Sequence, residues 1–405
     1  MRSPQLVLKA GKEKSLRLGH PWIFSGAIQT LRGKAEDGSQ LDVVDHKGQF
    51  LARAYYNAQS SIVARVFSRH EGENLDLDLL LRRIRSAWER RQALRTVDTN
   101  MQRVVASEAD LLPGLIIDHY AGWVVFQILT KGMDVLRSAI VQAIQEIFEP
   151  IGIVERSDEA IRTKEGLEPH KALVSGDLKT EGVLAREQGM QLWVNLWEGH
   201  KTGFYLDQRL NRQWVGRYAE GAEVLNCFSY TGGFSVAAGY GGAKRVISVD
   251  ESRPALDLAA RNWQLNVNRP EAQHETVRAD VFAYLRQLRE QGAQFDLIIM
   301  DPPKFVSDKH HIDRACRGYK DLNLLAMQLL REGGHLATFS CSGLVSRDLF
   351  QKVVFGASVD ASCDMQILHH LSQAEDHPTL LSFPESLYLK GLMCRKISGA
   401  GGSRA

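Results

Sequence analysis

Two short segments of the sequence carry side chains that could perform covalent chemistry on a flat substrate. The first is Asp301-Pro-Pro-Lys-Phe305, which directly follows the apolar stretch 296–300. Two consecutive prolines cannot continue a sheet, so they form a rigid shelf that aims Asp301 and nearby carbonyls at a planar ligand. The second is Ser340-Cys341-Ser342, in which a thiol lies among small polar neighbours. Together they predict a carboxyl group and a nucleophile at the mouth of one sheet.

The reaction that such a pair would serve is methyl transfer to carbon 5 of a cytosine. That carbon is too weak a nucleophile to attack a sulfonium methyl group directly. A thiolate at Cys341 that adds to C6 makes C5 enamine-like, and C5 can then accept the methyl group. Asp301 would hold the Watson–Crick edge of the base or help to protonate N3. The base must leave its stack for this reaction unless the nucleic acid is already single-stranded.

The other four cysteines are poorer candidates. Cys227 belongs to the hydrophobic end of a strand and is predicted to lie in the core, and Cys316 is predicted to lie in a loop beyond the proline shelf. Cys363 and Cys394 are assigned to late strands. An odd number of scattered cysteines without a CxxC pair argues against disulfides and against a structural zinc site, and no metal is expected.

The region around these groups alternates strand-like and helix-like segments. Strands are predicted at 223–227, 245–250, 276–279, 296–300 and 335–340, and helices at 233–239, 254–265 and 322–330. Short apolar strands separated by helices indicate an α/β domain with a mostly parallel sheet that is covered on both faces.

A ligand of such a sheet binds beyond the carboxyl ends of the strands. The candidate cofactor-binding residues after the first strand are Asn226, Phe228, Tyr230, Thr231 and Gly232. Asp250 ends the next strand, about 20 residues further on, where a carboxylate can accept both hydroxyl hydrogens of a ribose. Asp280, after the third strand, could contact an adenine edge.

The bulky loop residues help to choose between two cofactors. The pyrophosphate of a nicotinamide dinucleotide requires glycines in the loop, so that the backbone can approach it closely. This loop has Phe228 and Tyr230 at such positions. S-adenosylmethionine has no phosphate, and aromatic faces can attract its sulfonium. The sequence therefore predicts S-adenosylmethionine as the cofactor.

The N-terminal part has a different character. Residues 1–70 contain 11 Lys/Arg and 5 Asp/Glu, whereas the whole chain has a net charge of +2. This excess suggests a module that holds a polyanion, although an ordinary solvated surface explains the charge equally well. Short alternating segments at 5–8, 41–44, 51–56 and 62–67 predict a small β-rich barrel or sandwich.

The middle of the chain is predicted to be a separate α+β region. Its first helix, predicted at 77–94, carries an arginine-rich run that is read as a solvated face or as a track for an RNA backbone. The run consists of Arg82, Arg83, Arg85, Arg90, Arg91 and Arg95.

Composition limits the location. The 44% hydrophobic and 24% charged residues are typical of a soluble globular protein. No apolar run approaches the roughly 20 residues that span a bilayer, and the first residues lack the apolar region of a secretory signal. The sequence predicts a cytoplasmic protein without a membrane partner.

The chain resembles the PUA-domain ribosomal RNA large subunit methyltransferase I family, which makes 5-methylcytosine in 23S rRNA. The resemblance covers nearly the whole length. The segments that carry it are Arg17-Leu-Gly-His-Pro-Trp-Ile-Phe24, Lys201-Thr-Gly-Phe-Tyr-Leu-Asp-Gln-Arg209, Asn226 to Gly233, Asp301 to Phe305 and Ser340 to Ser342.

The resemblance implies a PUA RNA-binding domain at 1–72, a small central α+β domain at 73–190, a class I (Rossmann-like) methyltransferase domain at 191–397 and a flexible tail at 398–405. It implies that Cys341 is the nucleophile and that Asp250, Asp280 and Asp301 line the cofactor and target pocket. Asp207 and Gln208 are expected to help close that pocket. It also implies a single-stranded or flipped-out base of 23S rRNA as the target and allows a homodimer.

The chain differs from many RNA 5-methylcytosine enzymes at one position that bears on removal of the C5 proton. Many RNA 5-methylcytosine enzymes have a second cysteine beside the proline of the Asp-Pro segment, and this chain has Lys304 there. The group that removes the C5 proton is therefore not identified, and a water or Asp301 are the two candidates.

Two rival functions stay open at this point. An enzyme that methylates an exocyclic nitrogen of guanine or adenine uses (Asn/Asp)-Pro-Pro-aromatic and needs no thiol, whereas here Lys304 precedes Phe305 and Cys341 is present. An RNA-binding assembly factor with a vestigial Rossmann-like domain is the second rival, and the intact Asp250 and Asp301 speak against it.

Overall fold

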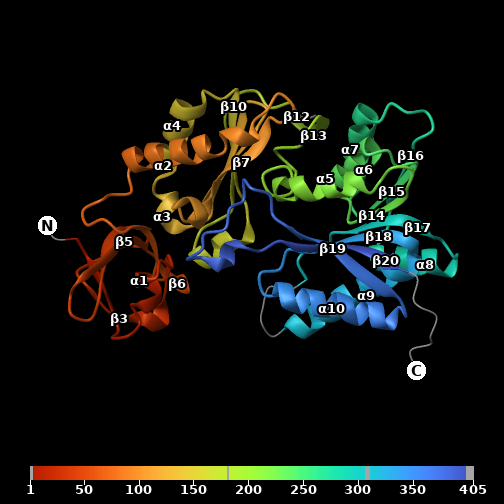
Figure 1. The fold of residues 1–405 in the computed structure, drawn as a ribbon. Helices are drawn as coiled ribbons and strands as arrows, with labels where there is room; N and C mark the ends of the chain where they lie inside the picture. The colour runs from red at the N-terminus through yellow and green to blue at the C-terminus, as the bar shows by residue number, and fades with distance from the viewer. Residues whose placement is uncertain (1–2, 180–181, 306–310, 398–405) are drawn as a thin grey trace. The chain divides into compact units, whose positions relative to one another are not determined.

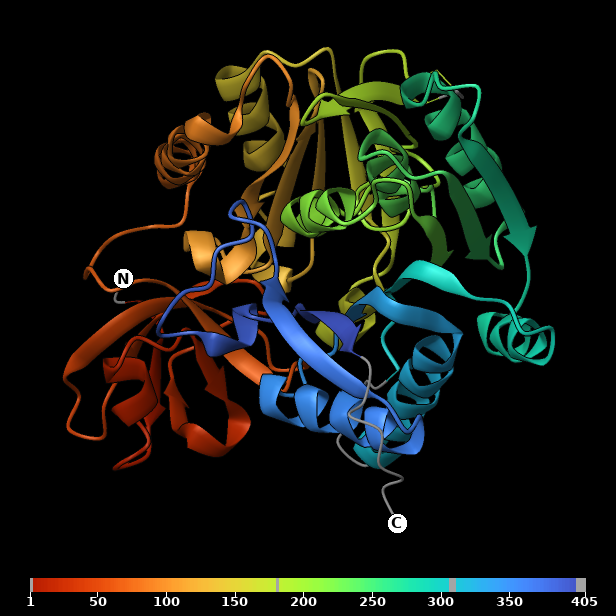
Figure 2. The ribbon, with the colours of Figure 1, turned by 45° about the vertical axis from the view of Figure 1, so that its right-hand side comes forward.

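The computed structural model describes residues 3–179, 182–305 and 311–397, so the predicted flexible tail at 398–405 lies outside the described residues. The chain forms two compact units (Figures 1 and 2). Unit 1 consists of 1–186, 194–206 and 376–386, and unit 2 consists of 187–193, 207–375 and 387–405. The two units are described in turn.

The N-terminal part of unit 1 is a six-stranded sheet with the order β2-β6-β5-β4-β1-β3. All neighbouring strands are antiparallel except β1 and β4. Inward residues such as Leu6, Leu41 and Ala64 form its core, and the prediction of a β-rich N-terminal domain is confirmed. The elements are β1 (Gln5–Leu8), α1 (Lys14–Arg17), β2 (Trp22–Phe24), β3 (Ile28–Arg32), β4 (Gln40–Val44), β5 (Phe50–Tyr56) and β6 (Ile62–Ser68).

The second part of unit 1 is a five-stranded sheet with the order β11-β10-β9-β8-β7. Helices α2 and α4 pack together and bury their apolar residues against it, which gives the predicted α+β arrangement (Figure 1). Asp76 caps α2, because its side chain accepts a hydrogen bond from the amide of Leu79. The elements are α2 (Leu77–Arg90), β7 (Met101–Ala106), β8 (Leu115–Tyr120), β9 (Trp123–Ile128), α3 (Lys131–Asp134), α4 (Arg137–Phe148), β10 (Gly152–Ser157) and β11 (His170–Ser175). A separate two-stranded sheet follows, with β12 (Val183–Glu187) and β13 (Met190–Val194).

Unit 2 is built on a seven-stranded sheet with the order β16-β15-β14-β17-β18-β20-β19. The first five strands in this order are parallel, and β20 is antiparallel to both of its neighbours. The strands are β14 (Glu223–Cys227), β15 (Arg245–Asp250), β16 (Gln273–Arg278), β17 (Phe295–Met300), β18 (Leu330–Ser340), β19 (Asp364–Ser372) and β20 (Lys390–Ile397). The helices are α5 (Arg209–Arg217), α6 (Gly233–Tyr240), α7 (Arg253–Asn266), α8 (Val281–Glu290), α9 (Ile312–Leu329) and α10 (Arg347–Asp360).

Both faces of this sheet are covered, as the sequence predicts. Along β17, Leu297 and Ile299 face a core formed with α5, α6 and α7, whereas Ile298 and Met300 face a core formed with α8, α9 and α10. Because successive side chains of a strand point to opposite faces, a strand buried on both sides must be apolar throughout. The α/β fold with a Rossmann-like sheet is confirmed.

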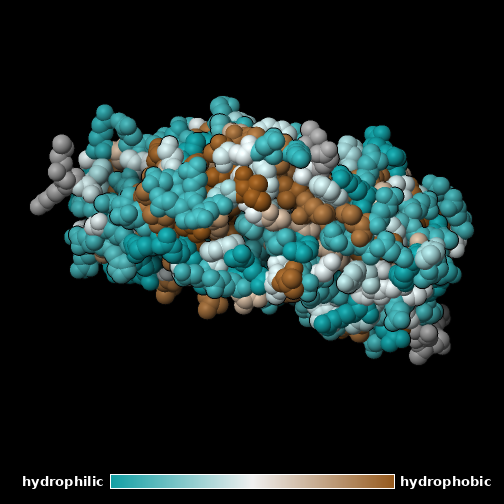
Figure 3. All heavy atoms as spheres, turned by 90° about the horizontal axis from the view of Figure 1, so that it is seen from above, coloured by the Kyte–Doolittle hydropathy of each residue, from teal (hydrophilic) through white to brown (hydrophobic). Residues whose placement is uncertain are grey.

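Among the described residues, no helix is long and apolar enough to cross a membrane. Seen from above, most of the visible side chains are hydrophilic, and apolar side chains also come to the surface in patches (Figure 3).

Candidate active site

The candidate site lies at the carboxyl edge of the seven-stranded sheet in unit 2. Here the strand order reverses, since β15 and β16 extend from one side of β14 and β17 and β18 from the other. Cys227 at the end of β14 pairs with both Val249 and Met300. Met300 in turn pairs with Thr338 of β18. The loops after these strands therefore start close together, and sheets of this type bind ligands at such a reversal.

The loop after β14 has a backbone conformation that side chains rarely adopt. Phe228 and Tyr230 have φ angles of 58° and 48°, in the left-handed region, and Gly232 has a φ angle of 78°. A Cβ atom at Gly232 would lie 2.8 Å from the Cβ atom of Ala259 in α7, so a larger residue does not fit. Two strained aromatic residues in one loop are typical of a ligand-binding turn, because the surrounding structure has to hold them.

Asp250 ends β15 and holds this loop. Its Oδ2 atom accepts a hydrogen bond of 2.9 Å from the amide of Tyr230, and its Oδ1 atom accepts one of 2.9 Å from the amide of Ser252. Asp250 is partly exposed, and each carboxylate oxygen can accept more than one hydrogen bond. Asp250 thus shapes the loop and still has acceptor capacity for two hydroxyl groups of a ribose.

Several buried polar atoms around β14 have no hydrogen-bond partner among the described residues. They are Oδ1 of Asn226, Oγ of Ser229 and Oγ1 of Thr231, in side chains that are almost fully buried. The Nδ2 atom of Asn226 donates to Ser235, so only its carbonyl oxygen is left over. An unsatisfied buried polar group costs about 1–3 kcal/mol, so this cluster suits a ligand with several polar groups. The nucleoside and amino-acid parts of S-adenosylmethionine have that character.

Asp280 follows β16 and is exposed. Its Oδ1 atom accepts a hydrogen bond of 2.8 Å from the amide of Ala283 and so caps α8. The structure gives this residue a local structural role, and the contact with an adenine edge stays a prediction.

Asp301 follows β17 and belongs to a polar cluster that is largely buried. Its Oδ2 atom accepts a hydrogen bond of 2.9 Å from Nε2 of Gln208, whose Oε1 atom accepts one of 2.5 Å from Asn211. Burial, followed by the negative charge of Asp207, raises the pKa of Asp301 to about 7, while the Gln208 hydrogen bond and the charge of Arg212 act in the opposite direction. Asp301 can therefore carry or release a proton near neutral pH.

Asp207 is buried, with 7% of its surface exposed. Its Oδ2 atom accepts a hydrogen bond of 2.6 Å from the hydroxyl group of Tyr388, and its backbone carbonyl accepts one of 2.8 Å from the amide of Ala374. Its Oδ1 atom has no partner in the part of the chain that the structure describes. One oxygen of a buried carboxylate is thus left for a donor such as the amino group of a bound amino-acid moiety.

A buried ion pair anchors the helix that starts next to Gln208. Nε and Nη2 of Arg212 in α5 lie 2.6 and 2.8 Å from the two carboxylate oxygens of Glu187. Both side chains are almost completely buried. Such a bidentate ion pair has one preferred geometry, so it fixes the start of α5. It thereby also fixes the side-chain amide of Gln208, which donates the hydrogen bond to Asp301.

Cys341 directly follows β18 and is partly exposed. The hydroxyl group of Ser340, the last residue of β18, donates a hydrogen bond of 3.0 Å to the hydroxyl oxygen of Tyr319. Cys341 packs at the margin of the core that contains Phe339 and Leu389. The thiol is neither enclosed in the core nor fully solvated, as a nucleophile at the mouth of the sheet requires.

Lys390 is the feature of this site that the sequence analysis missed. It pairs in register with Ser340, and its side chain is buried. Its Nζ atom donates hydrogen bonds to the backbone carbonyls of Ser342 and Val345, the latter at 2.8 Å. No carboxylate forms an ion pair with it within the described ranges. Burial lowers the pKa of Lys390 to about 8, against the opposing effect of Cys341.

A buried ammonium group that faces carbonyls instead of a carboxylate is unusual, and beside a thiol it favours the thiolate. The signal in the sequence was a lone lysine within the apolar segment 387–394, which strand alternation alone does not mark as functional. Glu187, Arg212 and Tyr388 were also missed, because they act through contacts with residues far away in the chain.

The other cysteines lie away from this position. Cys227 and Cys394 are buried, and burial raises the pKa of Cys227 strongly and that of Cys394 to about 12. The placement of Cys227 in the core is therefore confirmed. Cys363 lies just before β19, outside the strand to which it was assigned. The prediction of a loop at Cys316 is wrong, because α9 begins at Ile312; the polar first turns and Gly318 hide the start of this helix in the sequence.

The doubly wound sheet, the strained loop and the acidic residue at the end of β15 define a class I methyltransferase. A family model described as an S-adenosylmethionine-dependent methyltransferase matches residues 169–391, and a model described as a PUA-like domain matches residues 6–69. The chain is thus an S-adenosylmethionine-dependent methyltransferase with a PUA-like domain.

Comparison with known proteins narrows the class. Ribosomal RNA large subunit methyltransferase I of Erwinia tasmaniensis is 49% identical over 97% of this chain and 99% of the relative, and the Escherichia coli protein of the same name is 48% identical with the same coverage. The crystal structure of the methyltransferase SMU.776 in complex with SAH has a TM-score of 0.84 at 25% identity, over 98% of this chain and 100% of that one. The chain belongs to the ribosomal RNA large subunit methyltransferase I family.

Proposed function

We propose that the protein methylates carbon 5 of a cytosine in 23S rRNA through a covalent bond between Cys341 and C6. The names of the relatives support a ribosomal RNA substrate. The observation that carries the choice of carbon 5 is a partly exposed thiol beside the buried Lys390. Asp301, a carboxyl group with a pKa raised to about 7 by burial, belongs to the same sheet edge.

S-adenosylmethionine would supply an electrophilic methyl group when bound. Asp250 would accept hydrogen bonds from the ribose hydroxyls, and the unsatisfied oxygen of Asp207 would accept one from the amino group of the methionine part. Asn226, Ser229 and Thr231 would bind other polar groups of the cofactor. The strained aromatic residues Phe228 and Tyr230 and the turn at Gly232 would shape the loop around it, and Asp280 would contact the adenine edge.

The protein groups then act in a fixed order. The ammonium group of Lys390 favours the thiolate of Cys341, which forms a bond to C6 of the cytosine. The displaced ring electrons reach N3, which takes the proton of the Asp301 carboxyl group. C5 is now nucleophilic and would take the methyl group, with S-adenosylhomocysteine as the leaving group.

The last steps restore the aromatic ring. The C5 proton passes to a base, the bond between C6 and the sulfur breaks, and the Cys341 thiolate is released. If a water takes the C5 proton, the proton on N3 returns to Asp301; if Asp301 takes the C5 proton, the proton on N3 leaves to water. Asp301, which is a carboxylate after its proton has moved to N3, and a water are the candidates for the base at C5.

The N-terminal sheet would bring the RNA to the enzyme. Three of its arginines are engaged within unit 1, since Arg17 pairs with Asp45, Arg53 with Asp42 and Arg65 with Glu165. Its lysines are exposed and available to phosphates. They are Lys9, Lys12, Lys14, Lys34 and Lys47. The target base would be single-stranded or flipped out.

The proposal also includes a cytoplasmic location and a homodimer. The homodimer rests on the family resemblance alone.

The rival reaction at an exocyclic nitrogen has less support. It needs an aromatic ring after the prolines that is available to stack on the base. The ring of Phe305 is partly exposed but already contacts other aromatic rings, with its centroid 4.8 Å from that of Tyr319 and 6.3 Å from that of Phe282.

The direct test uses rRNA that contains 5-fluorocytidine, because fluorine at C5 cannot leave as a proton and the covalent complex persists. Incubation with the methyl donor should give an RNA–protein adduct that resists denaturation. Cys341→Ala should abolish the adduct, and Cys363→Ala, a partly exposed thiol away from the site, should retain it. An adduct that persists in Cys341→Ala would overturn the proposal.

A further inference from the structure

The arginine-rich run around α2 divides into two groups in the structure. Arg82 and Arg83 contact the carboxylate of Glu73. Arg90 and Arg91 contact that of Asp110. Arg83 and Arg91 are largely buried, whereas the side chains of Arg82 and Arg90 are 65% and 54% exposed, so part of the run forms a solvated face and its ion pairs within unit 1 interrupt a continuous track for RNA.

Arg95 differs from these four. Its guanidinium carbon lies 4.1 Å from the centroid of the Trp88 ring, in a cation–π arrangement. Among the described residues, no carboxylate forms an ion pair with it. Stacking on Trp88 limits the positions of this side chain while leaving its charge and its donors for another partner.

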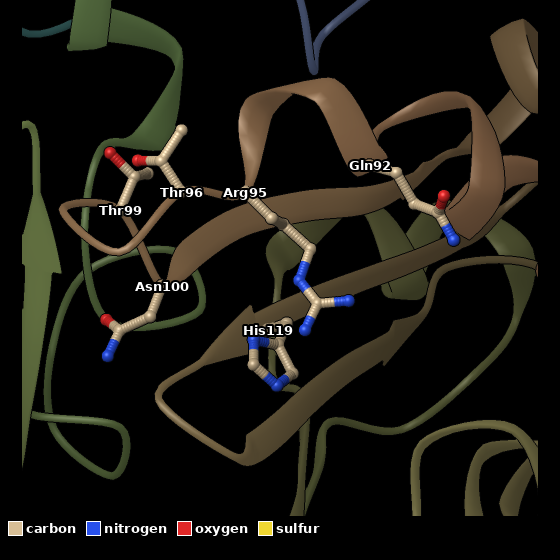
Figure 4. Close-up of a pocket in the computed structure, with 6 residues that line it drawn as sticks. All are labelled: Gln92, Arg95, Thr96, Thr99, Asn100 and His119. Atoms are coloured by element: carbon tan, nitrogen blue, oxygen red, sulfur yellow. The ribbon is translucent and has the colours of Figure 1, made fainter.

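Arg95 also lines a hollow of about 410 Å³ in the central part of unit 1, shown in Figure 4. The other lining residues supply amides, hydroxyls and one imidazole. They are Gln92, Thr96, Thr99, Asn100 and His119. In Figure 4 the guanidinium of Arg95 lies beside the ring of His119. Burial, followed by the charge of Arg95, lowers the pKa of His119 to about 4, so this imidazole is neutral at pH 7.

The walls of the hollow are held by backbone contacts. Oδ1 of Asn100 accepts a hydrogen bond of 2.6 Å from the amide of Arg186, and the amide of Asn100 donates one of 3.0 Å to the carbonyl of Arg186. Thr96 and Thr99 form an isolated β-bridge. At neutral pH the lining thus carries one positive charge, no negative charge and several groups that both donate and accept hydrogen bonds.

We propose that this hollow binds one nucleotide of single-stranded RNA, with a phosphate at Arg95 and the base against the amides and the His119 ring. The inference rests on the proposed function, because it assumes an RNA substrate. A planar guanidinium matches the oxygens of a phosphate, and amide side chains match the polar edge of a base. The volume falls in the range of about 300–1,000 Å³ that is usual for small-ligand sites, so it can take a nucleotide.

A comparison of two arginines tests the proposal. Arg95→Ala removes the charge at the hollow, and Arg85→Ala removes an exposed charge of α2 that does not line it. Affinity is measured by fluorescence anisotropy with a labelled oligocytidylate at fixed low salt. We expect about a fivefold to tenfold weaker affinity for Arg95→Ala and less than about a twofold change for Arg85→Ala. Equal effects of the two variants would overturn the proposal.

A second pair of variants leaves Arg95 in place. Gln92→Glu places a negative charge in the lining of the hollow and should weaken oligocytidylate binding by about threefold or more. Gln145→Glu adds the same charge at an exposed position of α4 outside the hollow and should have little effect. An unchanged affinity in Gln92→Glu would contradict the site even if Arg95→Ala were weakened.

The same variants separate this inference from the proposed reaction. Loss of RNA affinity in Arg95→Ala without any 5-fluorocytidine adduct in the unmodified protein would support the RNA site and contradict the cytosine chemistry. A Cys341-dependent adduct together with unchanged affinity in Arg95→Ala would support the cytosine chemistry and contradict the RNA site.

Discussion

Cys227 and Cys341 lie at the carboxyl ends of two strands of one sheet, yet their surroundings differ. Cys227 is the last residue of β14 and points into the core shared with α8 and α9, where burial raises its thiol pKa strongly. Cys341 comes one residue after β18 ends, is partly exposed and lies beside the ammonium group of Lys390. In the register of the sheet Cys227 is level with Met300 and Thr338, so Cys341 lies three residues further toward the loops, and this difference in position separates a structural cysteine from a candidate nucleophile.

The two strand ends also have different tasks. The strained loop after β14, together with Asp250 at the end of the neighbouring β15, presents backbone and carboxylate groups, which suit a bound cofactor. After β18 the chain presents a thiol, which suits a reacting base. A parallel sheet brings both to the same edge because its strands all end there.

The largest expected effect is that of Cys341→Ala on turnover. Without the nucleophile, C5 is not activated, and we expect methyl transfer to rRNA to fall by at least about a thousandfold. S-adenosylmethionine should still bind with an affinity within about twofold of that of the unmodified protein, since Cys341 belongs to the other strand end. Transfer of a radioactive methyl group and calorimetry measure the two quantities. Full turnover in this variant would remove the distinction between the cysteines.

The second prediction concerns Asp301→Asn, which should separate activity from stability. Loss of the proton donor should lower turnover by about a hundredfold or more. In the folded protein the pKa of Asp301 is about 7, above the value near 3.8 of an unperturbed carboxyl group. The folded state therefore holds this proton more tightly, and the contribution of Asp301 to stability falls as pH rises from about 4 to about 7.

Asparagine cannot acquire that charge, so Asp301→Asn should unfold at a temperature about 2–4 °C higher than the unmodified protein at pH 8. The gain should shrink as pH falls towards 4, where the carboxyl group of Asp301 is neutral anyway. Asp348→Asn, at an exposed carboxylate of α10, serves as the control and should show no such dependence on pH. Calorimetric scans across this pH range check the sign.

The sequence specified the sheet and its strand ends well. The strands at 223–227 and 245–250 were predicted with the bounds that the structure has, because buried parallel strands are short, apolar and followed by glycine or acidic residues. The resemblance already placed Gln208 in the pocket of Asp301, but two other partners could not be predicted. Tyr388 next to Asp207 and Lys390 next to the Cys341 loop are distant in sequence, and only folding brings them together.

The chain passes between the two units more often than a linear reading of the sequence suggests. The predicted limits at 72, 190 and 397 stay predictions. The structure assigns the short segments 194–206 and 376–386 to unit 1 although they are flanked by unit 2. Asp376 shows why a linear reading misses such segments: its side chain accepts a hydrogen bond from the amide of Arg103, and its carbonyl accepts two from Arg91. These contacts leave no periodic pattern in the sequence.

A third prediction addresses the role of Lys390 as a positioning residue. In Lys390→Met the ammonium group is lost, and the pH at which Cys341 is half alkylated by iodoacetamide should rise by about one unit. Lys390→Arg keeps the charge and should stay within about half a unit. Peptide mass spectrometry reports each thiol separately, so Cys363 in the same sample serves as an internal control. A purely structural lysine would leave the midpoint of Cys341 unchanged, and a thermal scan shows whether Lys390→Met is still folded.

The smallest effect is expected for Cys227, and it concerns stability instead of turnover. Cys227→Ala removes a buried sulfur and should cost about 1–2 kcal/mol of unfolding free energy, because the core can close around the gap only in part. Cys227→Ser should cost more, since its hydroxyl group would be buried among the apolar residues of β14, β15 and β17 without an evident partner.

Both variants should form the 5-fluorocytidine adduct and turn over within about twofold of the unmodified protein, because this thiol faces the core and not the ligand. Urea titration and methyl-transfer assays on the same preparations give the two quantities. Loss of the adduct in folded Cys227→Ala would mean that the end of β14 takes part in the chemistry, and the contrast between the two cysteines would then be wrong.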